Sequence, residues 1–204
     1  GGSKAQGVTG STAPVGDPYD IDYVAHEMGH QFGGYHIMNT CSRSGSGSTE
    51  VEPASGSSIM GYAGITSYDP APHSIPYYHA ATIQQIQTNL GSKTCPVTTS
   101  LSGNNATPVV SAYANRITPK STPFALTGAA SDANGDALTY CWEQWNLGDY
   151  KKDISATRKY GPIFRSFNPT ASPTRVFTTP AKLVKGVTNY LGEKLPDTGR
   201  YLTF

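Results

Sequence analysis

The feature that most constrains the fold of this chain is the stretch HEMGHQFGGYH, which begins at His26. The preceding residues GDPYDIDYVA predict a helix over residues 18–32, with Asp17 as its cap and Pro18 at its first helical position. On such a helix His26 and His30 lie about 40° apart around the axis and about 6 Å apart along it. Both imidazoles can therefore reach one ion.

The residues around these two histidines complete a predicted metal site. Glu27 lies about 100° from His26 around the axis, where it can contact a water molecule without binding the metal. Gly33 and Gly34 allow a left-handed backbone, which ends the helix and can bring His36 back as a third ligand. Three neutral imidazoles that leave one position open are typical of catalytic zinc, whereas structural sites usually have four protein ligands. This interpretation is favoured over a surface helix with scattered histidines.

A second motif follows the histidines. The stretch SSIMGYAG places Met60 directly after an isoleucine, and Tyr62 comes two residues later. A long zinc motif followed by a methionine turn is the metzincin pattern. On these residues the chain resembles a metzincin zinc endopeptidase. It is most similar to secreted bacterial reprolysin-like enzymes that carry an Ig-like domain after the protease.

The resemblance implies a role for the residues of both motifs. One zinc ion is bound by three ligands, which are His26, His30 and His36. Glu27 is the general base, and Met60 forms a hydrophobic floor beneath the metal. Tyr62 matches the tyrosine that astacins and serralysins use as a switchable zinc ligand and oxyanion stabiliser, although typical reprolysins lack it. The Pro- and Tyr-rich loop that follows would wall the pocket for the substrate residue just past the scissile bond, with Tyr77 and Tyr78 as candidates.

Charge is spread unevenly along the chain, and this supports a division into two domains. Residues 1–100 carry three basic and seven acidic side chains, whereas residues 101–204 carry twelve basic and seven acidic ones. We expect an α+β metzincin catalytic domain over residues 1–98, which contains the active-site helix and the methionine turn. An all-β sandwich of the Ig-like or cadherin-like kind is expected over residues 105–204.

Helix and strand patterns agree with this division. The stretch YHAATIQQIQTNLG predicts a second helix that ends at Gly91, and residues 42–58 are expected to form a surface loop. The residues expected to face the core are Ile21, Val24 and Met28 in the first helix and Ile83, Ile86 and Leu90 in the second. After residue 105 the strand-like stretches are FALTGAA, ALTYCWEQW, RVFTT and RYLTF.

Two further sites are open to more than one interpretation. Asp132, Asn134 and Asp136 alternate oxygen ligands and could hold calcium, but the stretch SDANGD is also strong turn chemistry, and a plain turn is favoured. Cys41 and Cys95 could form a disulfide that ties the zinc motif to the end of the second helix. Free buried thiols explain them equally well.

The expected function is that of a secreted zinc endopeptidase, with a peptide or protein as its partner. The alternative is a noncatalytic extracellular binding or adhesion module with a vestigial protease half, but retention of Glu27 beside the three histidines favours the enzyme. A net charge of +1 gives no reason to expect nucleic acid, and no apolar run is long enough to span a membrane. Only 25 residues precede His26, too few for the sheet and helix that metzincins place there, and the chain stops on the strand-like RYLTF without a closing signal. The chain is therefore expected to be incomplete at both ends.

Overall fold

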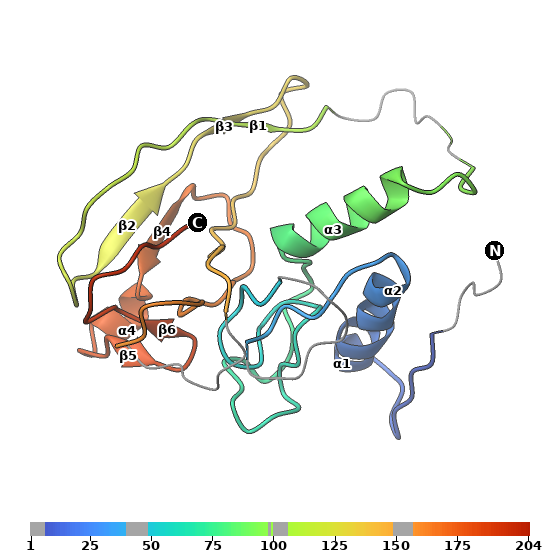
Figure 1. Cartoon of the computed structure of the whole chain (residues 1–204), viewed down its shortest axis with the longest axis horizontal. Coiled ribbons are helices and arrows are strands. Elements are labelled where there is room, and N and C mark those ends of the chain that lie inside the picture. The colour runs from blue at the N-terminus through green and yellow to red at the C-terminus, as the bar shows by residue number, and fades with distance from the viewer. Residues whose placement is uncertain (1–6, 40–48, 98, 100–105, 149–156) are drawn as a thin grey trace.

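The computed structural model describes residues 7–39, 49–97, 99, 106–148 and 157–204. Among these residues the first half of the chain contains the longer helices, and the second half contains the strands and one short helix (Figure 1). The site predicted from the sequence lies in the first half, so the elements there are described first.

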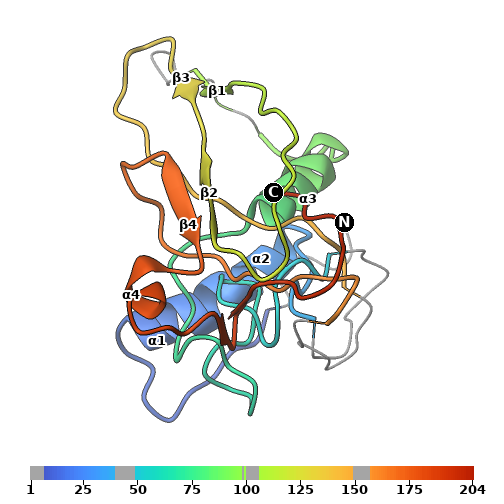
Figure 2. The same ribbon diagram turned by 90° about the vertical axis from the view of Figure 1, so that its left-hand side faces the viewer.

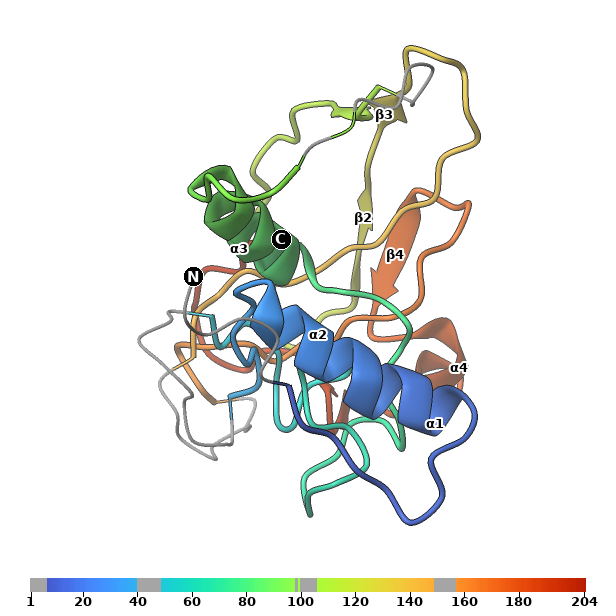
Figure 3. The same cartoon turned by 90° about the vertical axis from the view of Figure 1, so that its right-hand side faces the viewer.

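One continuous helix carries the motif that begins at His26. It consists of α1 (Asp17–Tyr19), the π-helical segment η1 (Asp20–Ala25) and α2 (His26–Gln31). Figure 3 shows these three as a single rod below α3 (Ala80–Gly91). The predicted helix is therefore confirmed over nearly its whole length.

The start of this helix differs from the prediction by one residue. Gly16 is the cap, with a φ of 76°, and no side chain caps the first turn. Asp17 is the first helical residue and Pro18 the second. Asp17 therefore stabilises the helix through its negative charge near the positive end of the dipole, and not as a cap.

The buried face of the helix also differs from the prediction. Ile21 and Ala25 pack against the core, and Gly29 is buried. Met28, which was expected to be buried, is 47% exposed. The π-helical segment explains the change, because it has more residues per turn than an α-helix. The next inward residue after Ile21 is therefore Ala25, four positions on, and not Val24, three positions on.

The second predicted helix is confirmed as α3, but its expected inward face is wrong. His79 caps it, since its Nδ1 accepts a hydrogen bond of 3.0 Å from the backbone N–H of Ala81. Ala81 and Thr82 are buried, whereas Ile83 and Leu90 are exposed. Ile86 is half-buried, and the later turns contact the end of the active-site helix through the polar side chains of Gln85 and Asn89.

The segment between the histidines and α3 supplies most of the core of the first half. Residues 49–61 are buried throughout, so the predicted surface loop is wrong for residues 49–58. Its remaining residues, 42–48, lie outside the described part of the chain. The core cluster beneath the active-site helix consists of Ile37, Val51, Ile59, Met60 and Ala81.

The second half forms three small antiparallel sheets within the described residues. The paired strands are β1 (Val109–Val110) with β3 (Ala130–Ser131), β2 (Phe124–Thr127) with β4 (Thr174–Phe177), and β5 (Asn189–Tyr190) with β6 (Glu193–Lys194). Figure 2 shows β2 and β4 side by side, with α4 (Pro180–Leu183) below them. The core of this half is made of Leu126, Ile163, Phe164, Phe177 and Leu195.

The predicted strands are confirmed only in part. FALTGAA contains β2 and the first residue of β3, and RVFTT contains most of β4. ALTYCWEQW forms only an isolated bridge, between Tyr140 and Thr170, and RYLTF forms no strand. In these stretches side-chain hydrogen bonds hold the backbone where strand pairing was expected. The described residues therefore do not show an Ig-like sandwich. The domain boundary near residue 100 stays a prediction.

Buried polar groups join the two halves. Glu143 of the second half accepts a hydrogen bond of 2.8 Å from the backbone N–H of Ala80, at the start of α3. The His79 ring lies 3.8 Å from its other oxygen. Burial raises the pKa of the Glu143 carboxyl to about 8, with a smaller contribution from the charge of Glu52. A second contact runs from the backbone N–H of Gly148 to the carbonyl of Glu50, at 2.7 Å.

Candidate metal centre

A tight helix end brings the third histidine of the motif back to the first two. Gly33 has a φ of 98°, a left-handed conformation that favours glycine. Its N–H donates to the carbonyl of His30 at 3.0 Å, and the N–H of Gly34 donates to the carbonyl of Gly29 at 2.8 Å. These two bonds are the Schellman motif of a helix end. The predicted turn is confirmed, and it directs the chain so that His36 faces the helix.

The three histidines point their Nε2 atoms at one place. Nε2 of His36 lies 3.1 Å from Nε2 of His26 and 3.0 Å from Nε2 of His30. Two nitrogens bound to one tetrahedral zinc at about 2.0–2.1 Å lie about 3.3 Å apart. The geometry is therefore close to that of a three-imidazole zinc site.

Hydrogen bonds on the other side of the rings fix which nitrogen carries the proton. Nδ1 of His26 donates to the carbonyl of Ile59 at 2.7 Å, and Nδ1 of His30 donates to the carbonyl of Gly34 at 2.8 Å. In the neutral rings the Nε2 atoms then carry lone pairs, and both face Nε2 of His36. A cation stabilises such converging lone pairs, so the donor set fits a bound metal ion.

Burial favours the neutral form of two of the three rings, those of His26 and His36. Burial, followed by the charges of His30 and His26, lowers the pKa of His36 to about 3. Burial also lowers the pKa of His26, although the hydrogen bond to Ile59 and the charge of Glu27 act in the opposite direction. Metal binding requires neutral imidazoles, so the lowered pKa values of His26 and His36 favour a bound metal ion.

Met60 lies directly beneath the helix between the two histidine ligands. Its side chain is fully buried, and a Cβ added to Gly29 would lie only 2.4 Å from its sulfur. The residue before it, Ile59, provides the carbonyl that orients His26. The methionine turn thus supports both the helix and one ligand from below.

The two predicted catalytic residues lie next to the ligands. The Tyr62 ring centroid lies 4.6 Å from that of His36 and 5.5 Å from that of His26. Glu27 is half-buried in the first turn of α2, close enough to raise the pKa of the His26 ring. Both residues lie near the histidines, and their catalytic roles stay predictions.

Tyr77 and Tyr78 point in different directions. The Tyr78 hydroxyl donates to the carbonyl of Ala25 at 2.5 Å, so this ring packs against the active-site helix. Tyr77 lines a cavity of about 560 Å³ together with Trp145 and Glu143 of the second half. Their role as walls of a substrate pocket stays a prediction.

The predicted calcium site is not supported. Oδ1 of Asp132 accepts hydrogen bonds from the backbone N–H groups of Asn134 and Asp136, at 2.8 and 3.2 Å. Oδ1 of Asn134 accepts from the backbone N–H of Ala106. These oxygens stabilise the turn itself, which is the alternative that the sequence favoured. In the described residues, the three histidines form the one group of His, Cys, Asp or Glu side chains whose ligand atoms could share a metal ion.

The predicted disulfide stays a prediction, since Cys41 lies outside the described residues. Cys95 is exposed. The third cysteine, Cys141, is half-buried, and its thiol donates to the carbonyl of Phe167 at 3.3 Å. Burial, with the charge of Glu143, raises the pKa of this thiol to about 12, so it is unreactive at neutral pH.

Comparison with known proteins agrees with the site. Residues 2–91 match the reprolysin-like metallopeptidase family M12B. This part of the chain is similar to a metallopeptidase. The matched metallopeptidase region contains the histidine motif and the methionine turn, and it ends at the last residue of α3. No curated protein and no solved structure matches the chain. The described residues contain no helix long and apolar enough to cross a membrane.

Proposed function

We propose that this chain is a zinc endopeptidase that hydrolyses peptide bonds in extended peptide or protein substrates. The observation that carries the proposal is the convergence of the three imidazoles: Nε2 of His36 lies 3.1 and 3.0 Å from Nε2 of His26 and His30, and one ligand atom of each ring lies within 4.8 Å of the others. The match to a metallopeptidase family over the same residues supports it. Zinc is the metal that this donor set suits, because three imidazoles leave a fourth position open.

The chain's own residues supply the proton transfers. Zinc held by the three histidines would polarise the scissile carbonyl and lower the pKa of water to about 7. Glu27 accepts the proton of the attacking water and passes it to the leaving amine. The Tyr62 hydroxyl donates a hydrogen bond to the oxygen on which negative charge develops.

The proposal includes the localisation of the enzyme and the nature of its second half. Its resemblance to secreted bacterial reprolysin-like proteases supports a place outside the cell, and a Cys41–Cys95 disulfide would agree with an oxidising compartment. The same resemblance supports the proposal that the second half of the chain is an Ig-like domain.

The experiment that tests the enzyme is a comparison of Glu27→Gln with the wild-type chain. Zinc content and cleavage of a set of unstructured peptides are measured on the same samples. We expect Glu27→Gln to keep one zinc and to cleave about 10²–10⁴ times more slowly, because it has lost the general base. Asp20→Asn is the matched control, since Asp20 is an exposed carboxylate on the same helix.

The outcomes separate the two functions that the sequence suggested. Equal cleavage by Glu27→Gln and wild type would disprove the role of Glu27. A wild-type chain that binds zinc but cleaves none of the peptides would favour the noncatalytic binding module.

A further inference from the structure

A buried carboxylate lies between the third histidine and the methionine turn. Glu52 is 1% exposed. Its Oε2 accepts hydrogen bonds from the backbone N–H groups of Ser57 and Ser58, at 2.7 and 2.9 Å, and from the Ser58 hydroxyl at 3.2 Å. The segment that leads into the methionine turn is therefore fastened to one carboxylate oxygen.

The other oxygen of Glu52 receives a hydrogen bond from the second half of the chain. Oε1 accepts from the backbone N–H of Ser166 at 3.2 Å and from the Ser57 hydroxyl at 3.0 Å. Burial alone raises the pKa of Glu52, but the nearby His79 ring and the bonds from Ser166, Ser57 and Ser58 hold it below its usual value. The side chain is thus a satisfied carboxylate, and not a buried acid without partners.

The backbone of Glu52 fixes the segment that follows the third histidine. Its N–H donates to the carbonyl of Ile37 at 2.9 Å, and its carbonyl accepts from the N–H of Asn39 at 3.1 Å. Ile37 directly follows His36, and Ile59, which orients His26, directly follows Ser58. One residue therefore fixes the backbone beside two of the three histidines.

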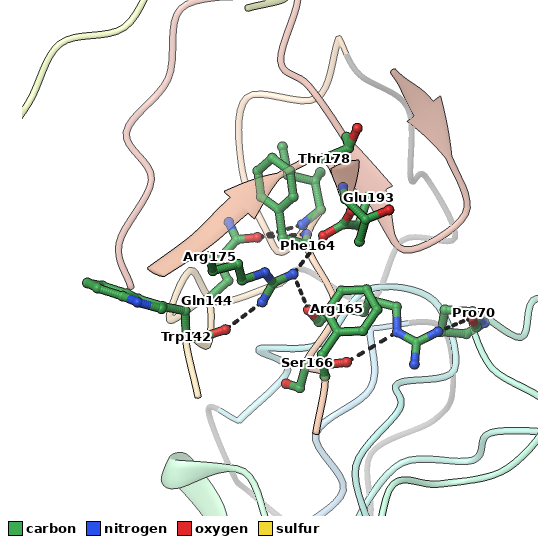
Figure 4. Close-up of polar contacts among 12 residues, drawn as sticks. Pro70, Trp142, Gln144, Phe164, Arg165, Ser166, Arg175, Thr178 and Glu193 are labelled. Atoms are coloured by element: carbon green, nitrogen blue, oxygen red, sulfur yellow. Dashed lines mark hydrogen bonds and ion pairs between the residues drawn. The ribbon is translucent and has the colours of Figure 1, made fainter. Parts of the chain in front are cut away.

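Hydrogen bonds fix the segment of the second half that contains Ser166 (Figure 4). The Arg165 guanidinium donates to the carbonyl of Pro70 in the first half at 2.5 Å. Oε1 of Gln144 accepts from the backbone N–H groups of Ile163 and Phe164, at 2.8 and 2.9 Å. Phe164 belongs to the core of the second half. This core consequently sets the position of the Ser166 N–H.

We propose that Glu52 is a positioning residue of the metal centre and that the second half of the chain completes its support through Ser166. The inference rests on the proposed zinc site and deepens it. It assigns the second half a part in shaping that site, which an independent appended module would not have.

Glu52→Gln is a sharp test because it keeps the shape and replaces one acceptor by a donor. An NH₂ group in place of Oε2 would face the N–H groups of Ser57 and Ser58. An NH₂ group in place of Oε1 would face the N–H of Ser166. Either orientation sets a buried backbone donor against another donor, so the methionine turn loses part of its fixation.

The measurements are zinc affinity, by competition with a chelator, and the visible spectrum of the cobalt-substituted chain, which reports ligand geometry. We expect Glu52→Gln to bind zinc about 10–100 times more weakly and to shift the cobalt spectrum. The matched control is Asp132→Asn. Oδ1 of Asp132 also accepts from two backbone N–H groups, those of Asn134 and Asp136, but these belong to the turn after β3. This control should leave both readouts unchanged.

Three results would overturn the inference. If Glu52→Gln keeps the affinity and the spectrum, or if Asp132→Asn changes them equally, Glu52 has no specific positioning role. If the wild-type chain binds neither zinc nor cobalt, the proposed function fails together with the inference.

Hydrogen exchange on the wild-type chain decides the matter even if Glu52→Gln does not fold. Coupling between two sites is reciprocal, so zinc binding should slow exchange of the Ser166 amide. The Tyr140 amide, which bonds to the carbonyl of Thr170 within the second half, is the control and should not respond. Equal responses of the two amides, or none at Ser166, would contradict the coupling.

Discussion

Gly29 is the position at which one added methyl group tests the packing beneath the metal centre. It lies on α2 between the ligands His26 and His30. A Cβ at this position would lie 2.4 Å from the Met60 sulfur and 3.0 Å from a ring carbon of Tyr78. Because Met60 is fully buried and the Tyr78 hydroxyl is bonded to the helix, neither side chain can move away freely.

Two effects of opposite sign determine how much the Gly29→Ala substitution changes the free energy of unfolding. Alanine in a helix is favoured over glycine by about 1 kcal/mol. Overpacking a filled core costs about 1–3 kcal/mol. We therefore expect the free energy of unfolding to fall by about 1 kcal/mol, and zinc affinity to fall with it because the helix between two ligands must shift.

The assay is urea unfolding of the metal-free chain, with Gly91→Ala as the matched control. Gly91 is the last residue of α3, and a Cβ there meets no atom within 4 Å. Gly91→Ala should raise the free energy of unfolding by up to about 1 kcal/mol. The two variants should then differ by roughly 1 M in urea midpoint. The packing argument is refuted if Gly29→Ala is as stable as Gly91→Ala.

Three further predictions address the oxyanion, the disulfide and the buried acid. Tyr62→Phe should lower kcat by about 10²–10³ with little change in KM or zinc content, whereas an unchanged kcat would make Tyr62 a packing residue. Nonreducing mass spectrometry should find Cys41 bonded to Cys95, a link worth roughly 4 kcal/mol, and two free thiols would remove it. Because the pKa of Glu143 is raised to about 8, the folded chain holds a proton that the unfolded chain has lost. The unfolding free energy of the metal-free chain should therefore fall by up to about 1.4 kcal/mol per unit from pH 6.5 to 8, and equal slopes in wild type and Glu143→Gln would contradict this.

The sequence predicted the clustering of the three histidines because the geometry that brings them together is local. The spacing of His26 and His30 on a helix and the glycine turn that returns His36 depend on few distant contacts. The exposure of Met28 could not be predicted in the same way. It depends on the π-helical segment η1, and no local pattern in that stretch marks a widened turn.

The burial of the segment before the methionine turn was missed for a different reason. A stretch rich in serine and glycine has the composition of a loop. Here its backbone donors are satisfied by the Glu52 carboxylate, which lets Ser57 and Ser58 lie in the interior. The one signal in the sequence was a glutamate a few residues before the motif, and its partner Ser166 lies more than 100 residues away.

Strands in the second half were overpredicted because alternation in short stretches does not specify a partner. β2 and β4 pair along their length, since Phe124 and Phe177 are stacked in the core. In ALTYCWEQW, Gln144 instead bonds to the backbone of residues 163 and 164, and Glu143 bonds to α3. Side chains used in this way leave no regular ladder, a tertiary effect that overrides local propensity.

The most direct test of the metal centre is zinc K-edge X-ray absorption on the zinc-loaded chain. Three histidine Nε2 ligands with one open position predict three imidazole nitrogens and one oxygen at about 2.0–2.1 Å, with no sulfur. Replacement of His36 by alanine should remove one imidazole from the spectrum. A sulfur neighbour at about 2.3 Å, or a fourth imidazole, would contradict the account, because either would close the position that the proposed chemistry needs.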